Sequence, residues 1–165
     1  MPPLKRIIID GNNLIYRDAE LATVARRNFE QARHRLVLKL EEVAGALGYD
    51  RITVVFDGRR AALTLEQRSS GVEVAFAPAN LTADSVIERL AHDPEWPGNV
   101  LVVTSDRGER DTVEAQGVTT VGCSNFLASL ADCRKRLATS VRSLRTPASG
   151  SRLGDFFPPP PGGRE

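Results

Sequence analysis

The sequence predicts an α/β protein built on a doubly wound, three-layer, mostly parallel sheet. Three short apolar runs rich in β-branched residues carry this prediction: "RIIID" (6–10), "RITVVFD" (51–57) and "NVLVVTSD" (99–106). None of them shows clean alternation of polar and apolar residues, which is typical of strands buried on both faces. Helical patterns separate the runs, and strands that alternate with helices favour right-handed βαβ crossovers.

Helices and two further strands complete the expected order of elements. Residues 28–48 repeat apolar side chains at three- and four-residue spacing and end on Gly48, which suits a helix C-cap. Residues 82–93 open with Thr82 at the N-cap position and carry an apolar face. The remaining expected elements are strands at 72–76 and 118–122 and helices at 110–117 and 124–137. With strands numbered along the chain, the expected order in the sheet is 3-2-1-4-5.

Composition predicts one globular domain in the cytoplasm. The 165 residues are 41% hydrophobic and 26% charged, enough apolar material for a single core. No stretch approaches the roughly 18 to 20 apolar residues that span a bilayer. Cys123 and Cys133 are too few and too far apart for a zinc site or a disulfide framework. We therefore expect both to be reduced, buried thiols.

The end of the chain differs in composition from the rest. Residues 1–133 carry 15 Lys/Arg against 19 Asp/Glu, whereas residues 134–165 carry 7 against 2. From Thr146 onward the sequence is rich in Pro, Gly and Ser without apolar periodicity. We expect a folded domain over 1–140 and a flexible basic tail over 141–165. The tail is either a solvated terminus or an arm for a polyanion or for a protein groove that accepts Pro-rich peptide.

Acidic residues stand at the carboxyl ends of three expected strands. Asp10, Asp57 and Asp106 each follow an apolar run, and ligand sites of open α/β sheets lie at this edge. The order 3-2-1-4-5 brings these strand ends together. Asp84, in the first turn of the helix that begins after Thr82, points toward the same crevice. Four carboxylates are therefore expected to share one cleft.

Such a cluster predicts a bound divalent cation. Like charges at short range are costly, and Mg²⁺ or Mn²⁺ held by oxygen ligands relieves the repulsion. Asn12 and Asn13 can add amide oxygens or orient a water. Simpler explanations exist for each acid alone: the Asp-Gly pairs are turn formers, Asp84 complements a helix dipole, and Asp106 caps a helix. The convergence of the strand ends favours the metal site.

Four segments of the chain resemble the YacP-like branch of the NYN domains, a family of PIN-like nucleases. In chain order they are "IIIDGNNLI", "VVFDG", "ADSVIERLA" and "VVTSDRGERD", and the resemblance covers residues 5–137. It implies a Rossmann-like fold and metal-dependent cleavage of RNA that leaves 5′-phosphate and 3′-hydroxyl ends. It also implies a role in RNA processing or mRNA decay, with ribosome-associated mRNA among the partners. We expect endonucleolytic attack, and the sequence leaves exonucleolytic attack open as the alternative.

The resemblance also assigns roles to single residues. Its catalytic positions match Asp10, Asn13, Asp84 and Asp106, and Asp57 matches a further acid of the metal site. This chain departs from the family pattern in two places. Asn12 stands where an aromatic residue is common, and Ser85 stands where a second acid is common. The missing acid leaves the number of metal ions open.

Arginines adjoin the expected acidic cleft. Arg59 and Arg60 follow the second strand, and Arg107 and Arg110 follow the fourth. Guanidinium groups suit phosphate recognition, so we expect these four to bind RNA. The alternative is that they balance the neighbouring carboxylates.

Two other classes of protein are weighed against a nuclease. A non-catalytic RNA- or ribosome-binding protein keeps the fold and the arginines but does not need four acids. A phosphatase of another Rossmann-like lineage needs an acid two residues after Asp10, where this chain has Asn12. No Gly-rich phosphate loop is present in the sequence. The pattern therefore favours the nuclease.

Overall fold

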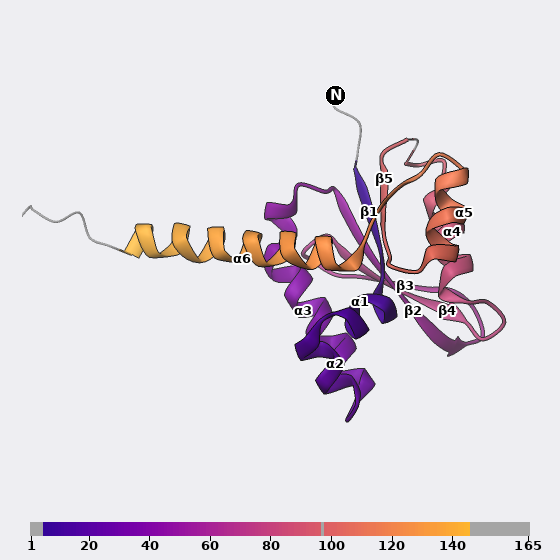
Figure 1. Ribbon diagram of the computed structural model, residues 1–165, viewed down its shortest axis with the longest axis horizontal. Coiled ribbons are helices and arrows are strands. Elements are labelled where there is room, and N and C mark those ends of the chain that lie inside the picture. The colour runs from indigo at the N-terminus through magenta and orange to yellow at the C-terminus, as the bar shows by residue number, and fades with distance from the viewer. Residues whose placement is uncertain (1–4, 97, 146–165) are drawn as a thin grey trace, which may run out of the picture.

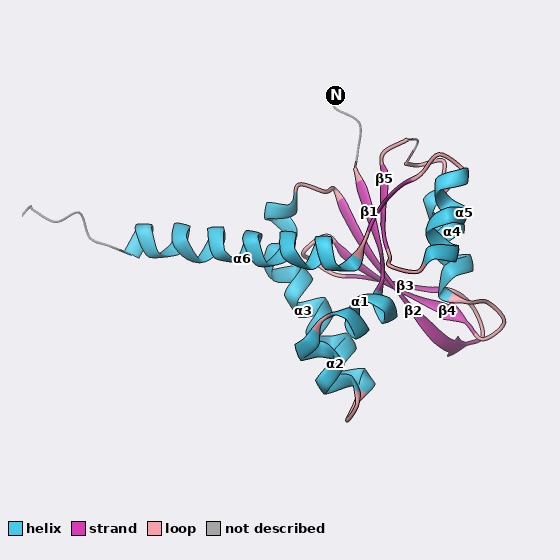
Figure 2. Cartoon of the chain, viewed as in Figure 1, coloured by secondary structure: helices cyan, strands magenta, loops and turns pink. Residues whose placement is uncertain are grey.

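The computed structural model describes residues 5–96 and 98–145, and these form a sheet with helices on both sides (Figures 1 and 2). The strands of this part of the chain are β1 (Arg6–Asp10), β2 (Arg51–Arg60), β3 (Thr64–Gln67), β4 (Val72–Pro78), β5 (Val100–Val103) and β6 (Thr119–Val121). Its helices are α1 (Gly11–Arg17), α2 (Ala19–Ala25), α3 (Phe29–Leu47), α4 (Ala83–Ala91), α5 (Arg107–Ala115) and α6 (Cys123–Arg145).

The sheet has the predicted class and contains the predicted series of parallel strands. Its order is β3-β4-β2-β1-β5-β6, and every neighbouring pair from β4 to β6 is parallel. The strands expected at 72–76, 51–57, 6–10, 99–106 and 118–122 thus lie side by side in the order 3-2-1-4-5. The added strand, β3, was not predicted. It pairs antiparallel with β4 at the sheet edge and is mostly exposed, so it lacks the apolar pattern of the buried strands.

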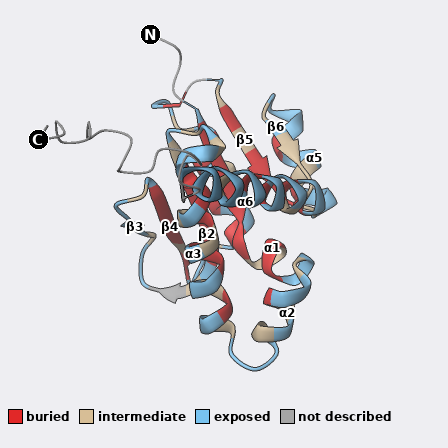
Figure 3. Cartoon of the chain, turned by 90° about the vertical axis from the view of Figure 1, so that its left-hand side faces the viewer, coloured by how far each residue is buried: buried red, intermediate tan, exposed pale blue. Residues whose placement is uncertain are grey.

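Side chains of β1 alternate between two cores. Ile7 and Ile9 pack with α3 and α6 on one face, while Ile8 packs with α4 on the other (Figure 1). All three isoleucines are fully buried. Figure 3 shows buried strand residues beneath exposed outer helix surfaces. The continuous apolar run is explained by its position in the middle layer, where neither face meets water.

Side-chain caps set the starts of the helices. Asn28 caps α3, Thr82 caps α4, and Gly48 follows α3 with a left-handed φ of 75°, a conformation that glycine adopts readily. Asp106 caps α5, which therefore begins at Arg107 rather than at residue 110 as predicted. The earlier start was missed because the first turn of α5 is polar.

Three other helices differ from the prediction. The short helices α1 and α2 were not expected, and both lie beyond the carboxyl end of β1 (Figure 1). The closing helix, expected at 124–137, runs from Cys123 to Arg145. Residues 141–145, assigned to the tail, are thus helical, and residues 146–165 lie outside the described part of the chain.

None of the helices described is both long and apolar enough to cross a membrane.

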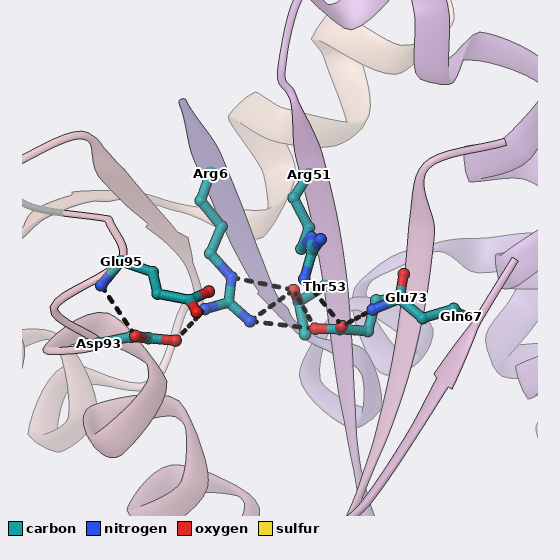
Figure 4. A network of polar contacts seen from close by, with 7 residues as sticks. All are labelled: Arg6, Arg51, Thr53, Gln67, Glu73, Asp93 and Glu95. Atoms are coloured by element: carbon teal, nitrogen blue, oxygen red, sulfur yellow. Dashed lines mark hydrogen bonds and ion pairs between the residues drawn. The ribbon is translucent and has the colours of Figure 1, made fainter. Parts of the chain in front are cut away.

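Buried charges tie the amino ends of the central strands together (Figure 4). Arg6 and Glu73 are only 2% and 1% exposed, and Arg6 Nη2 lies 3.0 Å from Glu73 Oε1. Thr53 lies between them: it accepts from Arg6 Nε at 3.1 Å and donates to Glu73 at 3.1 Å. Asp93 adds a second carboxylate at 3.4 Å from Arg6 Nη1. Burial lowers the pKa of Arg6, and the neighbouring carboxylates of Glu73 and Asp93 oppose this shift by stabilising its charge.

We expect Glu73→Gln to lower the free energy of unfolding by about 3 kcal/mol, because it leaves a buried guanidinium without its nearest carboxylate. Urea denaturation at neutral pH measures the loss. The control is Glu42→Gln, which removes an ion pair between Glu42 and Arg134 whose side chains are about half exposed. That change should cost less than about 1 kcal/mol. Equal losses in the two variants would contradict a structural role for the buried network.

Candidate metal centre

The first strand delivers Asp10 into the edge of the core. Asp10 is buried at the end of β1, and its Oδ1 accepts a hydrogen bond from Asn13 N at 3.1 Å as the N-cap of α1. The chain then passes directly over the ring of Phe56. A Cβ on Gly11 would lie 2.3 Å from that ring, so only glycine fits here without rearrangement. Glycine after Asp10 therefore serves close packing of α1 on β2.

Two helices bring further carboxylates to Asp10. Asp84 lies in the first turn of α4, and Glu109 lies in the first turn of α5. One oxygen from each of Asp10, Asp84 and Glu109 can be chosen so that all three lie within 4.8 Å of one another. A cavity of about 130 Å³, lined in part by Asp84 and Glu109, opens between α4 and α5. We call these three residues the carboxylate cluster.

Glu109 is the unusual member of the carboxylate cluster. It is only 5% exposed, and no donor among the described residues meets hydrogen-bond geometry at its carboxylate oxygens, although Thr104 and Asp10 lie close enough to influence its pKa. Burial, together with the charges of Asp10 and Asp84, raises its pKa to about 8. Burial and neighbouring carboxylates also raise the pKa values of Asp10 and Asp84. A buried acid without a hydrogen-bond donor is costly, and a cation among the three carboxylates would relieve that cost.

The other two predicted acids lie beside the carboxylate cluster rather than in it. Asp57 accepts from Asn12 Nδ2 and from Ala83 N, each at 2.9 Å, and so joins α1 to the start of α4. Asp106 accepts from Glu109 N at 3.0 Å as the cap of α5. Both residues are exposed, and both raise the pKa of Asp84 through their charge.

The two asparagines are held differently. Asn13 Oδ1 accepts from Ser105 N at 2.8 Å and from the thiol of Cys123 at 3.1 Å, so its oxygen is engaged within the protein. The amide nitrogen of Asn13 is the end left for a ligand. Asn12 Oδ1, in contrast, is buried without a hydrogen-bond partner in the described part of the chain. The amide oxygen of Asn12 is therefore the one without a partner, whereas the oxygen of Asn13 is already engaged.

Both cysteines are free and buried, as expected. Burial raises the pKa of Cys123, so this thiol stays protonated and can donate to Asn13.

The predicted RNA-binding arginines fall into three situations. Arg107 is exposed at the first position of α5, directly after Asp106. Arg110 donates to Thr120 at 3.2 Å and lies 3.7 Å from Glu114, so its charge is partly balanced. Arg59 and Arg60 end β2, and their side chains lie outside what the structure describes.

Sequence reasoning missed Glu109. Two signals in the sequence could have found it. Asp106 and Glu109 have the spacing of a capping box, which marks a helix start at residue 107. Glu109 also lies four residues before Val113, and this spacing places it on the buried face of α5.

An α/β fold of this topology, with carboxylates gathered at the carboxyl edge of the sheet, suggests a PIN-like nuclease fold. The model of the YacP-like NYN domain matches residues 7–155, and the chain belongs to this family.

Similarity to proteins of Bacillus subtilis agrees with this assignment. The chain is 29% identical over 149 residues to the uncharacterized protein YacP of strain 168. This alignment covers 89% of this chain and 87% of YacP. The crystal structure of Rae1 (YacP) matches with a TM-score of 0.72 and 29% identity, over 86% of this chain and 82% of that one. A single-substitution variant of Rae1 matches with a TM-score of 0.75 and 28% identity, over 88% and 87%.

The raised pKa of Glu109 makes stability without metal depend on pH. The folded protein holds this proton up to about pH 8, whereas the unfolded chain releases it near 4.5. As pH rises from 5 to 8, the unfolded state therefore binds fewer protons and the folded state loses stability, by on the order of 3 kcal/mol. Glu109→Gln should remove the part of this slope that comes from Glu109, while the raised pKa values of Asp10 and Asp84 leave a smaller slope.

Urea unfolding in EDTA at pH 5 and pH 8 measures the difference between wild type and Glu109→Gln. The two proteins should be similar at pH 5, and the variant should be more stable at pH 8. Asp111→Asn, an exposed acid on the same helix, is the control and should keep the wild-type slope. A wild-type slope in Glu109→Gln would show that Glu109 is not the group that titrates.

Proposed function

We propose that this protein is a divalent-metal-dependent ribonuclease that hydrolyses phosphodiester bonds of RNA endonucleolytically, in RNA processing or mRNA decay. The observation that carries the proposal is the buried, unpartnered carboxylate of Glu109 facing Asp10 and Asp84. Membership of the YacP-like NYN domain family supports the reaction class. RNA is the proposed partner, ribosome-associated mRNA included.

The donor set suits Mg²⁺ or Mn²⁺. The carboxylate cluster offers hard oxygen ligands only, and its negative charges repel until a cation lies among them. Asp10, Asp84 and Glu109 would hold the ion, with Asn12 Oδ1 as a further oxygen and with Asp57 and Asp106 at the rim. When bound, the ion would activate a water and neutralise a phosphate oxygen for in-line attack.

The protein's own groups position the substrate. Asn13 is fixed through its oxygen by Ser105 and Cys123, which leaves its amide nitrogen to donate to a phosphate oxygen. Asp57 holds Asn12 and the first turn of α4, and so fixes the direction of Asp84. Arg107, exposed beside Asp106, is placed to bind a neighbouring phosphate. The roles of Asn13 and Asp57 use contacts that are formed without RNA.

Binding of RNA without catalysis is the alternative function. Such a protein would use the exposed arginines but would have no reason to keep Glu109 buried and unpartnered. Metal-dependent cleavage of RNA would support the ribonuclease, whereas a non-catalytic binding protein would show no cleavage with or without metal.

Single-stranded RNA incubated with Mg²⁺ or Mn²⁺ should be cleaved, and EDTA should abolish cleavage. Asp10→Asn and Glu109→Gln should each lower the rate at least about 100-fold, because each removes a proposed ligand. The matched control, Asp111→Asn, should cleave at the wild-type rate. Gel analysis of end-labelled RNA measures the rates, and cleavage that survives chelation would refute the metal-dependent mechanism.

Metal binding should also appear as stabilisation. At a metal concentration about 100 times the dissociation constant, the wild type should gain about 2.7 kcal/mol, seen as a higher Tm. Asp84→Asn should gain clearly less, because it has lost one carboxylate of the cluster. Equal stabilisation of the two proteins would place the ion elsewhere.

A further inference from the structure

The face of α1 that reaches the carboxylate cluster continues outward to Tyr16 and Arg17. Asn12 and Tyr16 are four residues apart, as are Asn13 and Arg17, so each pair lies on one side of the helix. One turn of about 5.4 Å separates the members of each pair. Side chains of a helix lean toward its N-terminus, which directs Tyr16 toward the asparagines.

Tyr16 is unusual in its exposure. It is 66% exposed, and no other Phe, Tyr or Trp side chain in the described residues is exposed. Its ring packs against Phe29 with a centroid separation of 5.9 Å and an interplanar angle of 34°. An amphipathic ring that is supported on one side and open on the other is a stacking surface for a flat ligand.

Flat groups continue from Phe29 toward the strand ends. The guanidinium of Arg33 lies 5.1 Å from the Phe29 ring and 5.5 Å from the Phe56 ring. Phe56 immediately precedes Asp57, at the edge where the acids gather. The support beneath Tyr16 therefore runs through Arg33 to Phe56, the ring against which Gly11 at the start of α1 lies.

Positive charge accompanies the exposed ring. The acids of this segment, Asp18 and Glu20, are paired with Lys39 at 3.2 and 3.0 Å. Within the described residues, no salt bridge within 4.0 Å involves Arg17, and its side chain is exposed. A free cation next to an exposed aromatic ring is the combination that binds single-stranded nucleic acid.

We propose that Tyr16 and Arg17 form a subsite for an unpaired nucleotide of RNA, one or two nucleotides from the bond that is cleaved. The base stacks on Tyr16 and the adjacent phosphate pairs with Arg17. The choice of RNA as ligand rests on the proposed ribonuclease function. Because a paired base has no free face for a side chain, the subsite selects single-stranded over double-stranded RNA.

Binding measured in EDTA tests the subsite separately from catalysis. A fluorescein-labelled, unstructured RNA oligonucleotide is titrated with the full chain, and anisotropy gives Kd. Tyr16→Ala should weaken binding about tenfold, whereas Tyr16→Phe should stay near wild type because the ring is kept. Leu38→Ala, which removes another exposed apolar side chain from the helical layer, is the matched control and should not change Kd.

Salt dependence separates the roles of the two residues. Arg17→Ala should lower the slope of log Kd against log salt concentration by about 0.7, as expected for one lost phosphate contact on a single strand. Tyr16→Ala should leave that slope unchanged. A duplex of the same sequence should bind more weakly and should not respond to Tyr16→Ala.

Tyr16→Leu distinguishes stacking from packing. Leucine can fill the space beside Phe29 but has no π face, so it should bind as weakly as Tyr16→Ala. Wild-type affinity in Tyr16→Leu or in Tyr16→Ala would overturn the subsite, as would equal losses in Leu38→Ala. If Tyr16-dependent binding is found without cleavage, the subsite stands and the catalytic proposal fails. Cleavage and binding that are both indifferent to Tyr16 refute the subsite alone.

Discussion

Burial of β1 on both of its faces is the constraint on which the rest of the structure depends. Its three isoleucines are fully buried between two cores, so β1 must lie between β2 and β5 in the sheet. That position leaves only the two ends of β1 to carry polar groups, Arg6 at the amino end and Asp10 at the carboxyl end. The helices that follow the neighbouring strands start at the same edge, and they bring Asp84 and Glu109 with them. Hydrophobic packing thus concentrates negative charge at one end of the molecule.

The buried acidic side chains at the two ends of the sheet differ in whether they have a partner. At the amino end, Arg6 and Glu73 satisfy each other within a network that includes Thr53. At the carboxyl end, Glu109 is almost as buried and has no partner in the part of the chain that is described. This difference between the paired Glu73 and the isolated Glu109 is the basis of the metal site that we propose. Asp57 and Cys123 act around it as fixed supports, because each holds an asparagine in place.

Strand order and the positions of Asp10 and Asp84 could be predicted because they depend on short-range patterns. Apolar runs identify buried strands, and their carboxyl ends share an edge in any parallel sheet. Glu109 could not be placed in this way, since its direction depends on where α5 begins. A start at residue 110 leaves Glu109 in a loop, whereas the cap at Asp106 turns it into the core. The strand β3 was not predicted because it is held by backbone pairing with β4. Such pairing does not require an apolar pattern of side chains that the sequence would show.

The position of β1, first in the chain and central in the sheet, also sets the order in which a growing polypeptide can complete the domain. The strands that pair with β1 begin only at Arg51 and Val100. The apolar side chains of β1 therefore cannot be buried on both sides until most of the domain has been synthesised. At about 5 to 20 residues per second, roughly 5 to 20 s pass between the addition of Asp10 and that of Glu109. A nascent chain therefore has no complete carboxylate cluster until its last acid has emerged and docked. The site comes into existence late, at the moment when the two halves of the sheet close around the first strand.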